Sequence, residues 1–411
     1  MHQTTEFPEV VVVGGGPVGC FAALELAKLG TRVTLFEEHE AFGRPSHCAG
    51  HVSIRSLTSL GLYPLNKRII ENTFSKANFY SPSGFRFSIE LANPVTCSLN
   101  REAFDKYLAE KAEASGAVLH VKSVVQSLIL RNGVVQGVKV KQGENIEKIL
   151  PARIVIDAEG IASRILRQTG ISGFDREKLV YAVEAEVERV KDLPLDTVEV
   201  FLGRAYAPGF YAWLIPRSDG TAKVGLATKT GNPRKFLRTL MAKHPVASKR
   251  LARSKIIHMA FHPITIGGPI AITYCSGFLA VGDVASQVKP TTGGGVVLGL
   301  TCARIAAEVA HEAIQRNNVS SNFLALYKKR CIDTMGFDTG VMLRARQFFD
   351  RLPDKKVDEI LQFFTRIGLD KNLDKVSEID FQGRLLLRML PKPTVLVALA
   401  YLLKSYLSAN T

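Results

Sequence analysis

The chain has 411 residues, of which 46% are hydrophobic and 22% charged, and 53 Lys and Arg against 38 Asp and Glu give it a formal net charge of +15. This composition excludes a mainly disordered chain, and 33 glycines without a collagen repeat exclude a fibre. The length allows about two or three domains, and the positive charge favours an anionic partner, general solubility being the alternative.

The six cysteines contain no CxxC pair, so neither a metal site nor a secreted disulfide framework is expected. Cys302 and Cys331 would pair only if their helices touch. Residues 1–9 lack a basic leader segment, which favours a cytoplasmic location. Residues 259–282 carry no charge, but prolines and glycines interrupt them, so strands and turns are predicted there instead of a membrane span.

A strand, a glycine-rich turn and a helix open the chain. Residues 9–13 consist of Glu9 and a run of four valines, which predicts a buried strand, and residues 20–29 have helical periodicity that stops at Gly30. Residues 32–36 predict a second buried strand. This order predicts a βαβ unit at the start of a nucleotide-binding domain.

The turn carries the pattern Gly14-x-Gly16-x-x-Gly19, the fingerprint of a dinucleotide site. Gly14 permits the tight turn, Gly16 lets the main chain approach a pyrophosphate, and Gly19 lets the helix pack on the strand. The N-terminus of the helix that follows the turn offers free N–H groups and the positive end of its dipole to the phosphates. Glu37 ends the second strand and is placed to accept hydrogen bonds from the adenosine ribose.

The remaining elements follow from the same patterns. Strands are predicted at residues 79–91 around the turn Ser81–Gly84, at 118–140 with the hairpin signal Asn132-Gly133, and at 153–156, 179–190, 197–202, 210–215, 223–227 and 277–281. Helices are predicted at residues 101–115, 232–243 and 296–314, and only helices are predicted after about residue 318.

A second glycine-rich turn favours a flavin over NAD. Gly282-Asp283 follows an apolar strand, and Pro290-Thr-Thr-Gly293-Gly294-Gly295 precedes a helix. NAD needs no such turn, whereas FAD lies extended across the domain. Asp283 would hold ribityl hydroxyls, and the glycine main chain would face the N1/C2=O edge and stabilise the reduced flavin.

With both turns, the chain resembles the glutathione-reductase-type FAD superfamily in its aromatic-hydroxylase branch, and within it is similar to the geranylgeranyl reductase family over residues 8–315. Residues 281–295 are close to the family's flavin motif. Residues 156–164 resemble the superfamily's Asp-Gly motif, with Glu159 where Asp is usual and Leu166 where the terminal Arg is usual. Arg101 matches a position that contacts flavin in the superfamily.

Two further segments resemble this family more narrowly. Residues 208–216 match its P-x-x-Y-x-W-x-F-P pattern with Ile215 in place of Phe, so Tyr211 and Trp213 share one face of a strand. They would line an apolar cavity beside the flavin, the alternative being an ordinary aromatic pair in a sheet core. In His47-Cys48-Ala49-Gly50, Cys48 matches a family cysteine near the flavin and is the candidate for gating or protonation, the alternative being a small buried hydrophobe.

The resemblance implies an α/β (α+β) fold: a Rossmann-like FAD-binding domain at residues 1–75, 95–177 and 268–317, an antiparallel β-sheet substrate domain at 76–94 and 178–267, and a helical C-terminal domain at 318–411. The candidate catalytic residues are Cys48, Tyr211 and Trp213. The residues expected at the cofactor are Gly14, Gly16, Pro17, Gly19, Glu37, Glu38, Arg44, Cys48, Ala49, Gly50, Arg101, Val125, Asp283, Pro290, Gly293, Gly294, Gly295 and Val296.

The implied activity is FAD-dependent saturation of C=C bonds in geranylgeranyl chains of archaeal-type membrane lipids or their diphosphate precursors, by hydride from N5 of FADH2 plus a proton. No second GxGxxG follows a strand, so electrons are expected from transiently bound NAD(P)H or from an acidic ferredoxin-like protein. The rivals are a monooxygenase or halogenase of the same fold and a lycopene-cyclase-like isomerase. A nucleic-acid partner would rest on charge alone and is not expected.

The C-terminal helices leave two alternatives open. Residues 385–390 and 395–407 are apolar and flanked by Arg384, Arg388, Lys392 and Lys404. They would lie in a bilayer interface on the inner face of the membrane, or pack on the protein's own core.

Overall fold

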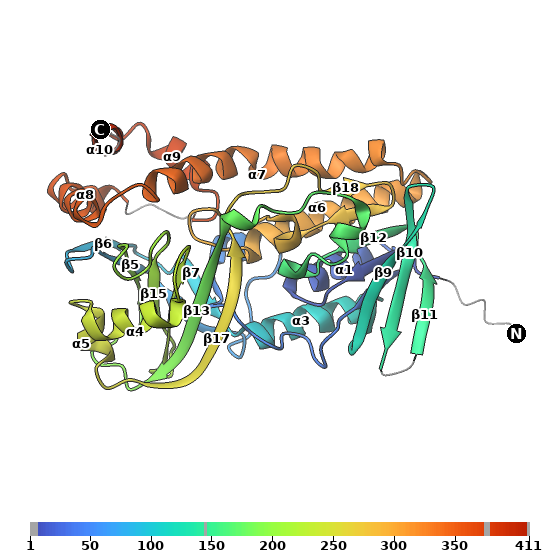
Figure 1. Cartoon of the computed structure of the whole chain (residues 1–411), viewed down its shortest axis with the longest axis horizontal. Coiled ribbons are helices and arrows are strands. Elements are labelled where there is room, and N and C mark those ends of the chain that lie inside the picture. Colours follow the sequence, from blue (N-terminus) through green and yellow to red (C-terminus); the bar gives the residue numbers. More distant parts are fainter. Residues whose placement is uncertain (1–6, 144–145, 374–378, 409–411) are drawn as a thin grey trace, which may run out of the picture. The chain divides into compact units, whose positions relative to one another are not determined.

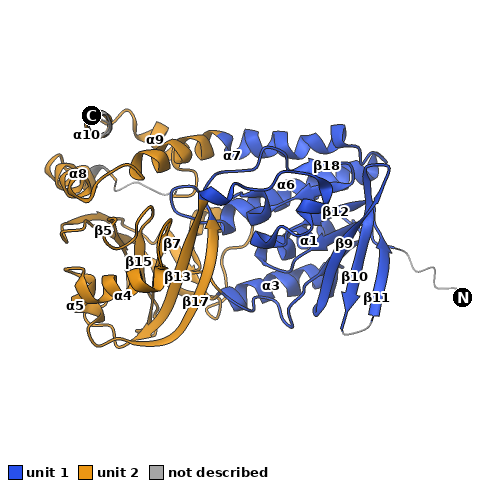
Figure 2. Cartoon of the chain, viewed as in Figure 1, with its two compact units in different colours: residues 1–46, 101–178, 265–336 blue, residues 47–100, 179–264, 337–411 orange. Residues whose placement is uncertain are grey.

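The computed structural model describes residues 7–143, 146–373 and 379–408, and in Figure 1 the chain is coloured along its length. It forms two compact units, drawn blue and orange in Figure 2: residues 1–46, 101–178 and 265–336 make unit 1, and residues 47–100, 179–264 and 337–411 make unit 2. The mixed α/β class with a helical C-terminal region is confirmed. The domain boundaries stay a prediction, because compactness does not separate cofactor-binding from substrate-binding segments.

Unit 1 is built on a six-stranded sheet. In spatial order its strands are β18 (Tyr274–Cys275), β19 (Phe278–Ala280), β12 (Ile154–Asp157), β1 (Val10–Val13), β2 (Val33–Phe36) and β8 (Val118–His120). All pairs except β18–β19 are parallel. The order of the parallel strands is that of a doubly wound fold, which places its switch point, where ligands bind, between β1 and β12.

Helices and a second sheet complete unit 1. Its helices are α1 (Pro17–Lys28), α3 (Arg101–Ala114), α6 (Val296–Gln315) and the first part of α7 (Ser321–Phe349). Strands β9 (Ser123–Arg131), β10 (Val134–Gln142) and β11 (Ile146–Pro151) form an antiparallel sheet that shares a hydrophobic core with β1, β2 and β12. Asn132 and Gly133 both have positive φ, as the predicted hairpin requires. The prediction of one meander over 118–140 is wrong at its start, because β8 pairs with β2.

Unit 2 is built on a seven-stranded sheet. Its strands are β17 (Lys255–Thr265), β13 (Leu179–Glu188), β16 (Ala222–Thr228), β15 (Ala212–Pro216), β14 (Thr197–Phe201), β5 (Lys76–Tyr80) and β6 (Arg86–Glu90). The prediction of an antiparallel sheet is wrong at one pair, because β5 comes from a distant part of the chain and runs parallel to β14. The remaining elements are the sheet of β3 (His51–Ser53), β7 (Thr96–Leu99) and β4 (Ile70–Phe74), and helices α2 (Ile54–Ser59), α4 (Pro233–Lys243), α5 (Ala247–Leu251), α8 (Asp354–Arg366), α9 (Gln382–Met389) and α10 (Pro393–Ser408).

The two faces of this sheet have different neighbours. Alternate side chains such as Leu214 and Val224 form one core with α4 and α5, which lie against the sheet in Figure 1. On the other face Trp213 and Ile215 pack against Phe74 of β4. The sheet therefore has one face closed by helices and one that carries the predicted aromatic pair.

The C-terminal helices pack on unit 2 and also leave apolar side chains exposed. Val395 and Ala398 of α10 are buried in a cluster with Phe87 and Leu361. Leu396 on the same helix is 52% exposed. Within the described residues no single helix is long and apolar enough to cross a membrane; only the bent pair of α9 and Pro393–Ser405 passes that test, by length and composition alone.

Candidate functional site

The first glycine turn has no room for a side chain at Gly14 and Gly19 but has open space at Gly16. Gly14 has φ +96°, and a β-carbon there would lie 2.5 Å from the carbonyl oxygen of Ala158. A β-carbon at Gly19 would lie 1.9 Å from the carbonyl oxygen of Gly14. At Gly16, in contrast, a β-carbon would meet nothing within 4 Å. The loop is thus tightly packed where helix meets strand and open where a pyrophosphate would approach.

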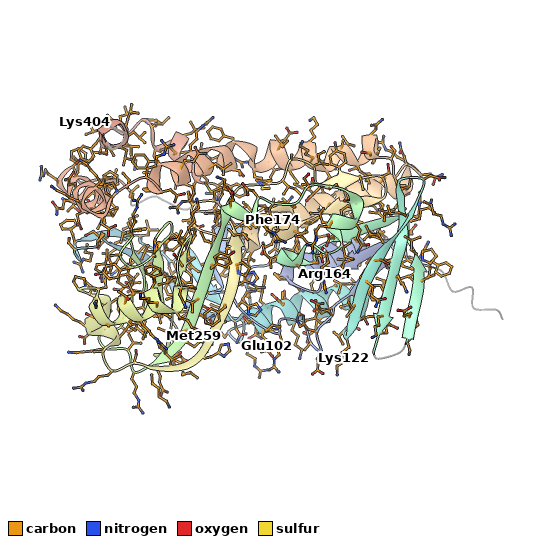
Figure 3. The ribbon with its side chains drawn as sticks, viewed as in Figure 1. Glu102, Lys122, Arg164, Phe174, Met259 and Lys404 are labelled. Atoms are coloured by element: carbon orange, nitrogen blue, oxygen red, sulfur yellow. The ribbon has the colours of Figure 1, made fainter. Side chains whose placement is uncertain are left out.

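Glu37 holds this loop from the end of β2. Its Oε2 accepts a hydrogen bond from Gly15 N–H at 2.5 Å and its Oε1 one from His39 N–H at 2.8 Å. The next residue, Glu38, lies at the surface and pairs at 2.7 Å with Arg164, which is labelled in Figure 3. The carboxylate of Glu37, which is predicted to bind the ribose, is therefore held in a fixed position by the main chain.

Arg101 is fixed at the start of α3. Its Nε and Nη2 donate to the two carboxylate oxygens of Asp105 at 3.1 and 2.8 Å. Burial raises the pKa of Asp105, Arg101 opposes that shift, and Glu37 adds to it, so this pair lies within electrostatic reach of the glycine loop. Asp105 is not among the predicted site residues, although its spacing of four residues from Arg101 is a recognisable helical ion-pair signal.

Arg44 approaches α3 from the loop after β2. Its Nε lies 2.6 Å from Glu102 Oε1, and a β-carbon at Gly43 would lie 2.6 Å from Glu102 Cα. Both charged side chains are substantially exposed, and Figure 3 labels Glu102. Arg44 and Arg101 are thus two cations anchored to the first turn of one helix.

The second glycine turn lies against the first. A β-carbon at Gly282 would lie 3.1 Å from Val18 Cγ1, and one at Gly299 would lie 2.6 Å from Val18 Cγ2. At Gly295, which precedes α6, a β-carbon would lie 2.8 Å from Asp283 Oδ1. The Asp283 carboxylate therefore lies beside the N-terminus of α6, as expected of a group that would hold a ribityl chain.

The rest of this turn forms its rim. Pro290 is buried, whereas residues 291–296 are partly exposed, including all three glycines and Val296. Val125 differs from the other predicted cofactor residues, because its side chain lies in the hydrophobic core. A cofactor would meet its main chain only.

Asp157 ends β12 at the switch point and carries an unpartnered oxygen. It is fully buried; its Oδ1 accepts the Glu159 N–H at 3.1 Å, and its Oδ2 has no hydrogen-bond partner among the described residues. Burial raises its pKa, and the charge of Glu159 raises it further. This acid supports the edge between β1 and β12 from within and is closed to a ligand. The open space at Gly16 and the uncapped N-terminus of α1 are the features that fit unit 1 to a dinucleotide such as FAD.

Unit 2 holds the predicted cysteine loop in a fixed position. Gly50 has φ +72°, its carbonyl accepts the Leu99 N–H at 2.9 Å, and its own N–H donates to Cys48 Sγ at 3.4 Å. Ala49 packs in the cluster that contains Trp213. The structure therefore brings the Cys48 loop and the aromatic face together.

Tyr211 and Trp213 lie on the face of the sheet away from α4 and α5, and both are partly exposed. Their rings meet edge to face at 5.8 Å. Burial raises the pKa of Tyr211, and Arg346 lowers it to a smaller extent, so its phenol stays protonated. An amphipathic aromatic pair on an accessible sheet face suits contact with an apolar chain.

A buried ion network missed by the sequence analysis lies beside this pair. Lys223 Nζ lies 2.7 Å from Glu71 and donates to the Ala49 carbonyl at 3.3 Å. Arg217 pairs with Glu71 at 2.6 Å and with Glu186 at 3.2 Å. The available signal was a lone lysine within the apolar strand β16, since buried lysines are rare without partners.

Two cysteines on neighbouring helices of unit 1 lie close together. Cys302 of α6 and Cys331 of α7 are both free, with their sulfurs 3.7 Å apart. The helices therefore touch without a disulfide.

Comparison with known proteins agrees with this geometry. A family model described as an FAD binding domain matches residues 8–313. Over 379 residues the chain is 35% identical to digeranylgeranylglycerophospholipid reductase 2 of Methanothermobacter thermautotrophicus, which covers 90% of this chain and 94% of that protein.

Solved structures extend the comparison to the fold. A geranylgeranyl bacteriochlorophyll reductase-like protein from Thermoplasma acidophilum superimposes with a TM-score of 0.85 at 26% identity, covering 97% of this chain and 99% of that one. The flavin-dependent brominase Bmp2 gives 0.70 at 20% identity over 89% and 92% of the two chains, which is a likeness of fold alone.

Proposed function

Because the chain belongs to the FAD-binding family that includes the digeranylgeranylglycerophospholipid reductases, we propose that it is an FAD-dependent reductase that saturates C=C bonds in geranylgeranyl chains of archaeal-type membrane lipids or their diphosphate precursors. The observation that carries this proposal is the likeness to a named reductase over nine-tenths of the chain. The fit of unit 1 to a dinucleotide and the cysteine loop beside the aromatic pair in unit 2 support it.

The residues of unit 1 bind and orient the cofactor. The turn at Gly16 and the N-terminus of α1 receive the phosphates, with Arg101 as a nearby cation. Glu37 takes the ribose and Asp283 the ribityl chain. Hydride from N5 is the chemistry that reduced FAD supplies when bound.

The residues of unit 2 orient the isoprenoid chain and exclude water. Tyr211 and Trp213 offer flat aromatic surface to an apolar chain, and water exclusion favours reaction of an isolated alkene that is otherwise a poor hydride acceptor. The loop at Cys48 is held against this face by Gly50 and Lys223, which keeps its thiol beside the reacting chain.

Anaerobic turnover tests the activity. FAD-loaded protein reduced with dithionite is incubated with digeranylgeranylglyceryl phospholipid, and mass spectrometry should show two hydrogen atoms gained per saturated bond. No mass gain would overturn the proposal. Oxygen-dependent incorporation of halide or oxygen would favour the halogenase or monooxygenase alternative, and an isomer of unchanged mass would favour the cyclase-like one.

We propose a small acidic ferredoxin-like protein as the electron donor. The net charge of +15 and the single GxGxxG fingerprint support this choice. Reduced ferredoxin should bleach the flavin anaerobically, with a rate that falls as salt screens the attraction. Flavin reduction by NADH or NADPH alone at the same rate would overturn it in favour of a nicotinamide donor.

We also propose that α9 and α10 dock peripherally on the cytoplasmic, anionic face of the membrane that holds the substrate. The exposed apolar side chains of this segment are Leu387, Leu396, Val397 and Leu403. The adjacent cations are Arg384, Arg388, Lys392 and Lys404. Apolar contact combined with positive charge is what interfacial helices use.

Vesicle sedimentation tests this contact. The double variant Leu396→Glu, Val397→Glu should lose binding to vesicles of anionic lipid, because both side chains are about half exposed on α10. Ile149→Glu is the matched control, since Ile149 is 70% exposed in β11 of unit 1. Equal binding of the double variant and the wild type would contradict the contact.

A further inference from the structure

Glu184 lies on β13, the second strand from one edge of the seven-stranded sheet, in a row that spans three strands. In the register of the sheet, Glu184 of β13 is opposite Gly225 of β16, and Gly225 is opposite Trp213 of β15. A β-carbon at Gly225 would lie 2.5 Å from Trp213 Cζ2, so the missing side chain lets the indole lie across the middle strand. The indole Nε1–H then donates to Glu184 Oε2 at 3.0 Å.

The charges around Glu184 act in opposite directions. Burial raises its pKa the most, the positive charge of Lys223 and the hydrogen bond from Trp213 lower it, and the net pKa is about 7. The carboxylates of Glu186 and Glu71 raise it. An ordinary glutamate is fully ionised at neutral pH, whereas here the acid and the carboxylate are both populated.

Glu184 also lies on the sheet face that is proposed to hold the isoprenoid chain. Its side chain is on the same face of the sheet as Trp213, and both are partly exposed. Tyr211, which contacts Trp213, is a weaker acid than Glu184, because burial raises the pKa of its phenol above the usual value. A group whose pKa lies near the working pH is the better proton donor in catalysis.

We propose that Glu184 stores the proton consumed in C=C saturation and supplies it to the face that carries Trp213; this inference rests on the proposed function. Each saturated bond gains one hydride from the reduced flavin and one proton from Glu184. Glu184 changes from acid to carboxylate, which the Trp213 N–H and Lys223 stabilise, and solvent returns the proton through its exposed edge.

The single tryptophan of the chain reports directly on this carboxyl group. In flavin-free protein, Trp213 fluorescence should follow a titration with a midpoint near the pKa of about 7. Glu184→Gln keeps an acceptor for the indole but cannot ionise, so its signal should not change with pH. Glu188→Gln, on the same strand and 35% exposed, is the matched control and should titrate like the wild type. A transition that survives in Glu184→Gln, or its absence in the wild type, would overturn the inference.

Single-turnover kinetics test the role in the reaction. Protein reduced with dithionite is mixed anaerobically with the geranylgeranyl lipid, and the wild-type rate should fall as the pH rises through about 7, because the acid form is lost. Glu184→Gln should be slower by roughly 100-fold or more and lose this pH dependence, with flavin reduction by dithionite and the apparent dissociation constant of the lipid unchanged.

The outcomes separate this inference from the function on which it rests. If the wild type saturates the lipid and Glu184→Gln is within about threefold of it, Glu184 is not the proton store and the reductase assignment stands. If the wild type does not saturate the lipid at all, both proposals fail.

Discussion

At the scale of single residues, the cofactor site depends on where a β-carbon can be accommodated. Gly14 and Gly19 face main-chain oxygens, whereas Gly16 faces open space. The three glycines of one fingerprint therefore have different physical requirements. Substitution should separate folding of the loop from binding of the cofactor.

Gly16→Ala should leave the free energy of unfolding within about 1 kcal/mol of the wild type, because glycine and alanine differ by only that much near a helix start. Its methyl group should still weaken FAD binding by about tenfold or more, since it fills the space that a pyrophosphate approaches. Gly19→Ala should lose FAD binding and also about 1–3 kcal/mol of stability through overpacking. Urea unfolding and flavin titration measure the two effects, and FAD affinity unchanged in Gly16→Ala would refute the placement of the phosphates.

Lys223→Met should lower the stability of the protein and raise the pKa of Glu184. Lys223 is 4% exposed and pairs with Glu71, so its loss should cost about 2–4 kcal/mol, less than for an isolated pair because Arg217 remains. Lys223 lowers the pKa of Glu184, and without it the midpoint of the Trp213 fluorescence titration should move above 7. Lys229→Met, at an exposed position just after β16, should leave the midpoint unchanged. A downward shift in Lys223→Met would contradict the assigned sign.

At the scale of elements, local patterns predicted what local sequence determines. The β1–α1–β2 unit, the hairpin at Asn132-Gly133 and helix α6 follow from periodicity and turn residues within each segment. Local patterns did not predict β3, β4 and β7, because these strands are short and pair with segments distant in sequence. The Trp213–Glu184 contact was not predicted either, because register between strands, not spacing along the chain, brings the two side chains together.

Gly225→Ala tests the strand row itself. The added β-carbon would displace the indole, which should break the bond to Glu184, abolish the pH transition of Trp213 fluorescence and cost about 1–3 kcal/mol. Val224→Ala is the control on the same strand, since Val224 is fully buried on the opposite face. It should lose similar stability and keep the transition. Loss of the signal in both variants would show that the transition reports general loosening of the sheet.

At the scale of the whole molecule, charge is unevenly distributed. No Asp or Glu lies between Asp219 and Asp283, whereas ten Lys or Arg do. The exposed cations of α4 and α5 lie on the face of the sheet away from Trp213. This region therefore contributes long-range attraction to anionic surfaces, separately from the apolar contact expected of α9 and α10.

Salt should separate these two contributions. Wild-type binding to anionic vesicles should weaken strongly as ionic strength rises, because screening shortens the reach of the charges to about 8 Å near physiological salt. The variant with Arg234, Lys235, Arg238 and Lys243 changed to Gln should bind more weakly at low salt and depend less on salt. Identical salt dependence of the two proteins, measured by sedimentation, would show that this segment does not meet the membrane.

The strand order of unit 1 has a consequence for synthesis on the ribosome. β1 emerges well before its neighbour β12, which begins at Ile154, and β19 follows only at Phe278. One edge of the nascent β1–β2 pair thus stays uncovered while more than a hundred further residues are translated. The parallel sheet is therefore completed late, and until then this strand edge is open to pairing with other chains.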